Sequence, residues 1–149
     1  MKIKSQIETE IRIKFKGMNL RLIIRIRILI VILLITILGF GSKMYSGAGS
    51  NWFNNSLAGL FYETFWCLVV LFINPRLKAI KIALWVFIFT SVLEFLQLWH
   101  PPFLQIIRTT FIGAALIGTS FNLLDFPYYL AGCISGFMLM KYLFSDGAD

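Results

Sequence analysis

Long apolar stretches, separated by short polar or proline-containing breaks, dominate this sequence. They run from Ile28 to Phe40, from about Leu57 to Ile73, from about Ala79 to Trp99, and from Phe126 to Phe144. A helix needs about 20 apolar residues to cross the ~30 Å hydrocarbon core of a bilayer. The sequence therefore predicts an all-α, polytopic membrane protein with four transmembrane helices.

The composition agrees with this class. Charged residues make up 14% of the 149 residues, against about 25% in soluble domains. The net charge of +7 arises from 14 Lys and Arg against 7 Asp and Glu. No aromatic or glycine-rich binding pattern accompanies the basic residues, so no nucleic-acid partner is expected. The single histidine argues against a zinc or haem site, and no metal or cofactor is expected.

Basic residues are concentrated at the start of the chain, in residues 1–27. We expect this segment to be cytosolic, beside an anionic leaflet, with Met18 as an alternative start site. Residues 28–144 would form a single transmembrane domain, and 145–149 a polar tail. Within residues 1–27, apolar residues recur at every fourth position and so share one face of a helix. They are Ile3, Ile7, Ile11 and Phe15. The eight basic residues are Lys2, Lys4, Arg12, Lys14, Lys16, Arg21, Arg25 and Arg27.

The connection after the second stretch determines the expected topology. It contains Asn74-Pro75-Arg76, and Lys78 and Lys81 follow. Proline cannot donate a hydrogen bond to a helix, so it ends the stretch. Positively charged loops face the cytosol, so we expect both this loop and the N-terminus to be cytosolic. The predicted location is the plasma (inner) membrane, crossed several times.

The segment Thr109–Leu124 leaves two topologies open. It is apolar but has only sixteen residues and contains Gly113 and Gly118. It could be a short re-entrant or interfacial segment on the outer side, or a fifth transmembrane helix. The two alternatives place Asp125 on opposite faces of the membrane. We favour four spans plus the short segment, because this places Asp125 beside Arg108 at the outer side.

Acidic residues within the apolar stretches are the main candidates for function. Glu63 and Glu94 lie in consecutive, antiparallel spans, and both fall at similar depth in the outer half of the membrane. Such carboxyls must be protonated, paired or exposed to a polar cavity. Gln97 continues the polar face of Glu94 three residues later, and Arg108 can bind a carboxylate or a phosphate. The structural alternatives are an interhelical hydrogen bond for the acids and a salt bridge from Arg108 to Glu94 or Asp125.

Several motifs resemble those of VanZ-like small membrane proteins, and more closely those of a related bacterial family of unknown function. The resemblance covers roughly residues 51–144, and the final helix of VanZ-like proteins usually carries asparagine where this chain has Tyr129. It implies a compact multi-span protein with a polar cluster toward the outer face. It also implies an association with resistance to glycopeptide antibiotics, without a settled reaction. The residues that carry it are Glu94, Gln97, Arg108, Gly118, Asp125, Tyr129, Gly132 and Gly136.

The leading hypothesis is an outward-facing polar cavity that binds a membrane lipid, an envelope-precursor headgroup or a small amphiphile. In an enzyme, Glu94 would be the general base and Arg108 the anion clamp, but we expect a non-catalytic role. The alternatives are an accessory or assembly subunit of a larger membrane complex, with other membrane subunits as partners, and a proton or cation pathway. Gly132 and Gly136 predict close helix packing, by default within the same chain. The candidate ligand-binding residues are Glu63, Glu94, Gln97, Arg108 and Asp125.

Overall fold

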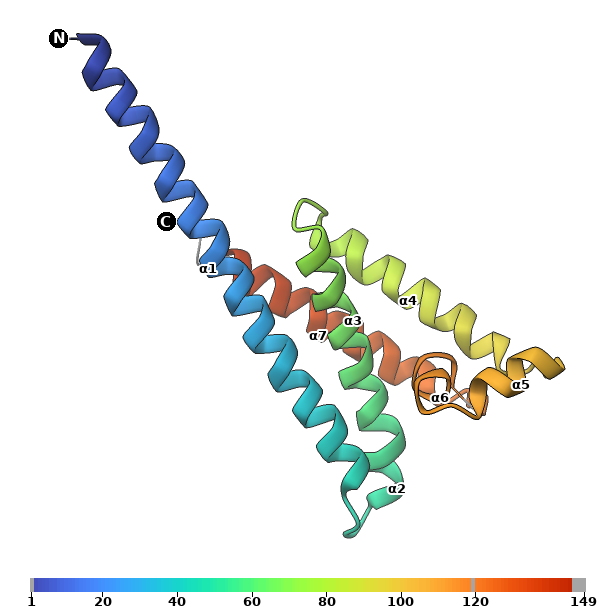
Figure 1. The fold of residues 1–149 in the computed structure, drawn as a ribbon. Coiled ribbons are helices and arrows are strands. Elements are labelled where there is room, and N and C mark those ends of the chain that lie inside the picture. The colour runs from blue at the N-terminus through green and yellow to red at the C-terminus, as the bar shows by residue number, and fades with distance from the viewer. Residues whose placement is uncertain (1, 119, 146–149) are drawn as a thin grey trace.

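In the computed structural model, the chain forms helices joined by short connections (Figure 1). The structure describes residues 2–118 and 120–145; for residues 2–21, 51, 53, 55, 144 and 145 it describes the backbone alone. No strand occurs in these parts of the chain, which confirms the all-α prediction. The predicted polar tail lies, apart from Ser145, outside the described residues.

Four of the helices are long, and each contains all or most of one of the four apolar stretches of the sequence. These are α1 (Lys2–Met44), α3 (Ala58–Ile73), α4 (Ala79–Leu96) and α7 (Asp125–Ser145). The remaining elements are short: α2 (Ser50–Trp52), the π-helical turn η1 (Phe53–Leu57), α5 (Pro102–Arg108) and α6 (Phe111–Ile117).

The break at Asn74-Pro75 ends α3 as predicted, whereas α4 ends before its proline-containing break. α3 ends at Ile73, and its cap residue Asn74 has left the helical conformation, with φ −132°. α4 ends at Leu96, three residues before the predicted limit, and a proline occupies the first turn of α5. Pro75 follows the end of α3, and Pro102 lies in the first turn of α5. Both positions suit proline, which lacks the N–H that a helix interior requires.

α1 continues without a break from the basic N-terminal segment into the first apolar stretch. Its 43 residues correspond to about 65 Å of helix. Figure 1 shows its N-terminal part running past the rest of the molecule as a straight extension. The proposed boundary at residue 27 is therefore not a break in the backbone.

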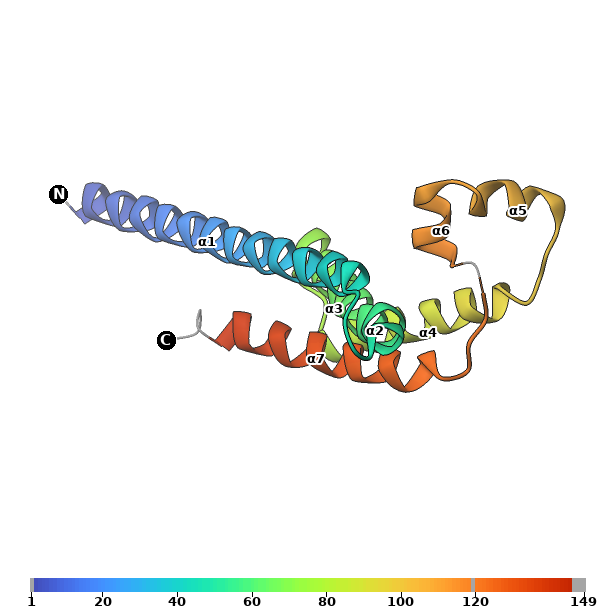
Figure 2. The same ribbon diagram turned by 90° about the horizontal axis from the view of Figure 1, so that it is seen from below.

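The segment Thr109–Leu124 does not form one helix. α6 has seven residues, about 10 Å of helix, which is far too short to cross a bilayer. Figure 2 shows α5 and α6 folded back beyond the end of α4, and an irregular connection leads from α6 to α7. The tyrosine hydroxyl of Tyr62 on α3 donates to the Leu116 carbonyl at 3.1 Å, which ties α6 to the bundle.

α3 lies at the centre of the bundle. It packs against α1, α4 and α7, with its most extensive contact on α7. Apolar side chains from all four long helices meet in one core. Its buried members are Ile28, Cys67, Leu68, Leu71, Ile82, Ala83, Val86, Cys133, Met140 and Leu143.

The outward faces of α1 and α4 are apolar and uncovered. On α4, for example, Trp85 is 68% exposed and Phe89 is 64% exposed. Among the described residues, Leu22–Met44 and Ala79–Leu96 are long and apolar enough to cross a membrane, whereas Ala58–Ile73 is apolar but shorter. These two helices support a membrane location for the protein.

Candidate functional site

The carboxylate of Glu94, near the end of α4, is the centre of a buried hydrogen-bond cluster. One oxygen, Oε2, accepts from Gln97 Nε2 and from the Tyr129 hydroxyl, each at 2.8 Å. The other, Oε1, accepts from the backbone N–H of Asn122, also at 2.8 Å. Glu94 and Gln97 are both almost fully buried. This one carboxylate therefore joins α4, α7 and the connection between α6 and α7.

The α6–α7 connection is fitted closely over this cluster. Gly118 has a φ of +76°, and a Cβ there would overlap the side-chain amide of Gln97, so both backbone and space require glycine. Further along, Asn122 donates through Nδ2 to Asp125 Oδ1 at 2.9 Å. Burial raises the pKa of the Asp125 carboxyl above its usual 3.8, and the nearby charge of Glu94 raises it further.

Arg108 lies at the end of α5, where its guanidinium donates to two backbone carbonyls. Its Nη1 donates to the Trp99 carbonyl at 3.1 Å and its Nη2 to the Leu96 carbonyl at 3.0 Å. Among the described residues it forms no ion pair with Glu94 or Asp125, so the salt bridge considered from the sequence is absent. Arg108 instead satisfies carbonyl groups at the C-terminal end of α4, where the helix dipole favours a cation.

Glu63 is separate from the Glu94 cluster and lies deeper in the bundle. It is 0% exposed, and its Oε2 accepts from the Cys133 thiol at 3.2 Å. Tyr129, which contacts Glu94, precedes Cys133 by four residues on the same face of α7. The contacts of Glu63 and Glu94 thus lie about 6 Å apart along α7, so the two acids occupy successive turns.

Glycines allow the helices around these acids to approach closely. A Cβ at Gly132 would lie 2.6 Å from Glu63 Cβ, and a Cβ at Gly136 2.7 Å from Cys67 Cβ. The Gly-x-x-x-Gly face of α7 therefore packs on α3 of the same chain, as predicted. On α3, Gly59 leaves room for the ring of Tyr129.

Several buried polar atoms at this end of the bundle have no hydrogen-bond partner. They are Glu63 Oε1, Ser91 Oγ and Arg108 Nε; Asn54 Oδ1 in η1 is a further case. Buried polar groups in folded proteins are satisfied in the great majority of cases, so each exception requires an explanation. Here three different helices, α3, α4 and α5, contribute unused hydrogen-bonding capacity.

The five candidate residues are thus divided between different surroundings. Glu94 and Gln97 are in direct contact, and Asn122 links them to Asp125, whereas Glu63 and Arg108 each have other partners. None of the five lines either of two surface pockets, one between α1 and α3 and one beside the α3–α4 connection. In the part of the chain that the structure describes, no three His, Cys, Asp or Glu side chains are placed to share a metal ion.

Sequence reasoning missed three donors to the acids: the Asn122 backbone, Tyr129 as a hydrogen-bond donor, and Cys133. Cys133 is buried and free of a disulfide, and its thiol donates to Glu63. The position of Tyr129, where the resembling proteins usually carry another polar residue, was the one available signal. A backbone donor such as Asn122 leaves no pattern in a sequence.

Comparison with known proteins relates the chain to one family. Residues 48–133 match the family described as "Protein of unknown function (DUF2809)". No curated protein and no solved structure matches the chain. The matched region contains all five candidate residues and Tyr129. It agrees with the resemblance to a family of unknown function, while the link to VanZ-like proteins still depends on the motifs alone. Because the match covers more than half of the chain, the protein belongs to this family, DUF2809.

Proposed function

We propose that the protein is a multi-pass membrane protein in which α1, α3, α4 and α7 cross the bilayer. The two sufficiently long apolar helices and the uncovered apolar faces of α1 and α4 support this placement. α3 packs against the other three long helices, so it would lie in the membrane together with them. The N-terminus and the α3–α4 connection would be cytosolic, and α5 and α6 would lie at the outer interface.

We further propose that the outer end of this bundle binds the polar headgroup of a lipid or envelope precursor. The observation that carries this proposal is the unused hydrogen-bonding capacity of Glu63 Oε1, Ser91 Oγ and Arg108 Nε. A polar group is expensive to bury without a partner in an apolar environment. A headgroup entering between α3, α4 and α5 would supply donors to Glu63 and an acceptor to Arg108.

Binding fits the geometry better than catalysis by Glu94. Its carboxylate accepts three hydrogen bonds, two of them from side chains and one from the backbone. Both carboxylate oxygens are therefore already engaged by partners within the protein. A general base must also be within reach of the proton that it removes, and the α6–α7 connection covers Glu94.

Headgroup binding can be tested with defined short-chain lipids. Purified protein in detergent is titrated with dioctanoyl phosphatidylethanolamine and dioctanoyl phosphatidylglycerol, and bound lipid is counted by native mass spectrometry. The expected result is weaker binding of at least one lipid by Glu63→Gln and Ser91→Ala. Ser135→Ala is the matched control, because that hydroxyl donates to the Ala131 carbonyl of its own helix at 2.9 Å. Equal binding by all three variants and the wild type would contradict the proposal.

The membrane topology has its own test. Single cysteines are introduced as Lys78→Cys and Asp125→Cys, and intact cells are treated with an impermeant maleimide. The native Cys67 and Cys133 are buried and are expected not to react in the folded protein. Four spans predict that position 125 is labelled from outside and position 78 only after the cells are opened. Five spans would place position 125 on the cytosolic side.

A second candidate function is that of an accessory subunit in a larger membrane complex. It is favoured by the aromatic face of α4, where Trp85 and Phe89 are both more than half exposed. The small-residue face of α7 is already occupied by α3, so α4 would be the docking surface. Copurification at fixed stoichiometry in mild detergent, lost in Trp85→Ala with Phe89→Ala, would support this role. The resistance role that the VanZ resemblance implies is tested separately, by growth with teicoplanin in cells that carry or lack the gene.

A further inference from the structure

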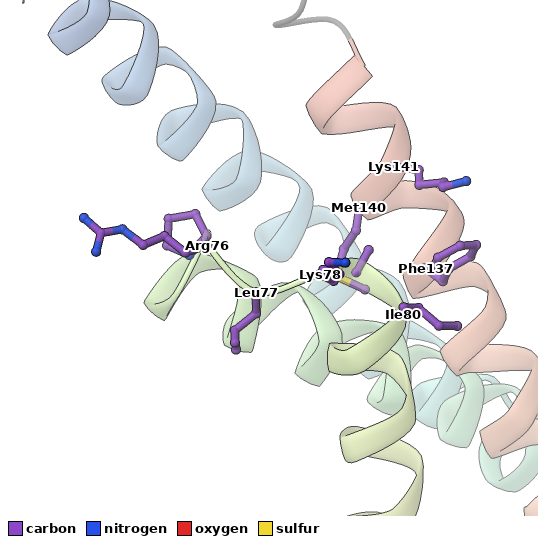
Figure 3. A pocket seen from close by; sticks show the side chains of 9 residues that line it. Arg76, Leu77, Lys78, Ile80, Phe137, Met140 and Lys141 are labelled. Carbon is purple, nitrogen blue, oxygen red and sulfur yellow. The ribbon is translucent and has the colours of Figure 1, made fainter.

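A hollow of about 560 Å³ lies beside the α3–α4 connection, at the opposite end of the bundle from Glu94. Its walls come from that connection, from the first turn of α4 and from the last turns of α7 (Figure 3). None of the residues that line it belongs to the candidate site at the outer end. The lining residues are Pro75, Arg76, Leu77, Lys78, Ala79, Ile80, Phe137, Met140 and Lys141.

The lining combines cations with apolar surface and contains no acid. In Figure 3, Lys78 lies near the centre of the view, between Arg76 and Lys141. Arg76 and Lys141 lie on either side, with their charged ends pointing outward. The Lys141 ammonium is 5.2 Å from the centre of the Phe137 ring. Exposed side chains of this length change rotamer within nanoseconds, so both flanking cations can turn toward a bound anion.

The start of α4 adds to the positive potential at this place. Lys78 is its cap residue, and no side chain accepts from the first backbone N–H groups. The intrahelical bonds begin at the N–H of Lys81 and Ile82, which donate to the Lys78 carbonyl. Free N–H groups at a helix start favour an anion such as phosphate, here next to three basic side chains.

Apolar rows lead from the hollow along both helices that form it. Side chains spaced by three or four residues on a helix share one face, and these rows begin at Ile80 on α4 and at Phe137 on α7. A soluble anion would bind to the cations without contacting these apolar rows, whereas the acyl chain of a lipid would lie along the rows. The exposed members are Ile80, Leu84 and Ile88 on α4, and Leu130 and Ile134 on α7.

We propose that this hollow, defined by Lys78, Arg76, Lys141, Ile80 and Phe137, binds an anionic glycerophospholipid. Its phosphate would lie at Lys78 and the start of α4, and its acyl chain along Ile80 and Phe137. This inference rests on the proposed membrane placement, but it is independent of headgroup binding at the outer end. The expected cytosolic orientation brings the hollow to the leaflet that carries anionic lipids.

The test is lipid binding by the full chain in detergent, measured by native mass spectrometry. The probes are dioctanoyl phosphatidylglycerol, dioctanoyl phosphatidylcholine and inorganic phosphate. We expect the anionic lipid to bind most tightly, and Lys78→Gln and Lys141→Gln each to weaken it about fivefold. Lys81→Gln is the matched control, because this exposed lysine is in the same turn as Ile80 but does not line the hollow.

Each other outcome contradicts the proposal in a distinct way. Equal weakening by Lys81→Gln would show that the lipid responds to the general positive charge of the surface and not to this hollow. Equally tight binding of phosphatidylcholine would show that the cations do not select an anionic lipid. Phosphate binding as strong as that of the lipid would show that the apolar rows do not contribute to binding. Circular dichroism checks that the lysine variants remain folded. Glu63→Gln and Ser91→Ala are measured in the same experiment, because they test headgroup binding at the outer end of the bundle. If these two variants bind lipid like the wild type, the lysine variants still test the hollow independently.

Discussion

Replacing Gly132 with alanine is expected to destabilise the protein, because α7 lies closest to α3 at this glycine. A Cβ at position 132 would be 2.5 Å from the Leu60 carbonyl oxygen and 2.6 Å from Glu63 Cβ. Neither atom can swing aside, since one belongs to the backbone and the other begins a fully buried side chain. The two helices must therefore move apart.

The size of the effect follows from this geometry. Carbon and oxygen atoms in close contact lie about 3.3 Å apart or more, so the helices must separate locally by about 0.8 Å. That movement lengthens the bond from Thr64 Oγ1 to the Gly132 carbonyl, now 3.0 Å, beyond hydrogen-bonding distance. Overpacking costs about 1–3 kcal/mol and the lost bond about 0.5–1.5 kcal/mol. The higher helix propensity of alanine offsets about 1 kcal/mol of this cost, which leaves a net loss of about 0.5–3.5 kcal/mol.

The assay is reversible unfolding in mixed micelles, titrated with SDS and followed by circular dichroism. Gly41→Ala in α1 is the matched control, because a Cβ there meets nothing within 4 Å. That variant should be unchanged or more stable by up to about 1 kcal/mol. A Gly132→Ala protein that unfolds together with the wild type would refute the packing argument, as would an equal loss in Gly41→Ala.

Other substitutions test the polar cluster. Tyr129→Phe removes one of three donors to the buried Glu94 carboxylate and should lower the free energy of unfolding by about 1–3 kcal/mol, while Tyr142→Phe at an exposed position should not; equal stability of the two variants would contradict this. Arg108→Lys cannot bond both carbonyls of the α4 end in the fork geometry of arginine, so amide exchange there should accelerate in a hydrogen–deuterium measurement, and unchanged exchange would speak against a capping role. Asp125 has a raised pKa in the folded protein, so its contribution to stability is lost as the pH rises from below 3.8 through that folded pKa. Asp125→Asn should therefore lose less stability than the wild type between pH 3.5 and 7, measured by the same unfolding titration; parallel curves would show that the carboxyl is unperturbed.

The helices and their ends were predictable because local chemistry determines them. Pro75 marks the end of α3 whatever the tertiary structure, since proline cannot continue a helix, whereas α4 ends at Leu96, before the prolines that follow it. The shared face of Glu94 and Gln97 follows from helical periodicity in the same way. The Gly-x-x-x-Gly packing of α7 was also predicted correctly, because two glycines one turn apart leave one face open.

The partners of the polar side chains depended on tertiary geometry and were not predictable. A salt bridge to an acid was the structural alternative considered for Arg108, but the path of the chain after α4 brings it to the carbonyls of Leu96 and Trp99. The depths of Glu63 and Glu94 were estimated as similar from the span limits. Their actual offset depends on how α7 is rotated and shifted against α3 and α4, which the sequence does not encode locally.

The unbroken course of α1 has a mechanical consequence. With Leu22–Met44 in a bilayer, residues 2–21 extend about 30 Å beyond it, whereas the potential of a charged leaflet decays over about 8 Å at physiological ionic strength. In that placement most of the backbone of residues 2–21 would lie beyond the reach of the leaflet's potential. Ile28 on the same helix is fully buried in the core. Because α1 is one continuous helix, a displacement of its N-terminal part would be transmitted to the core packing around Ile28.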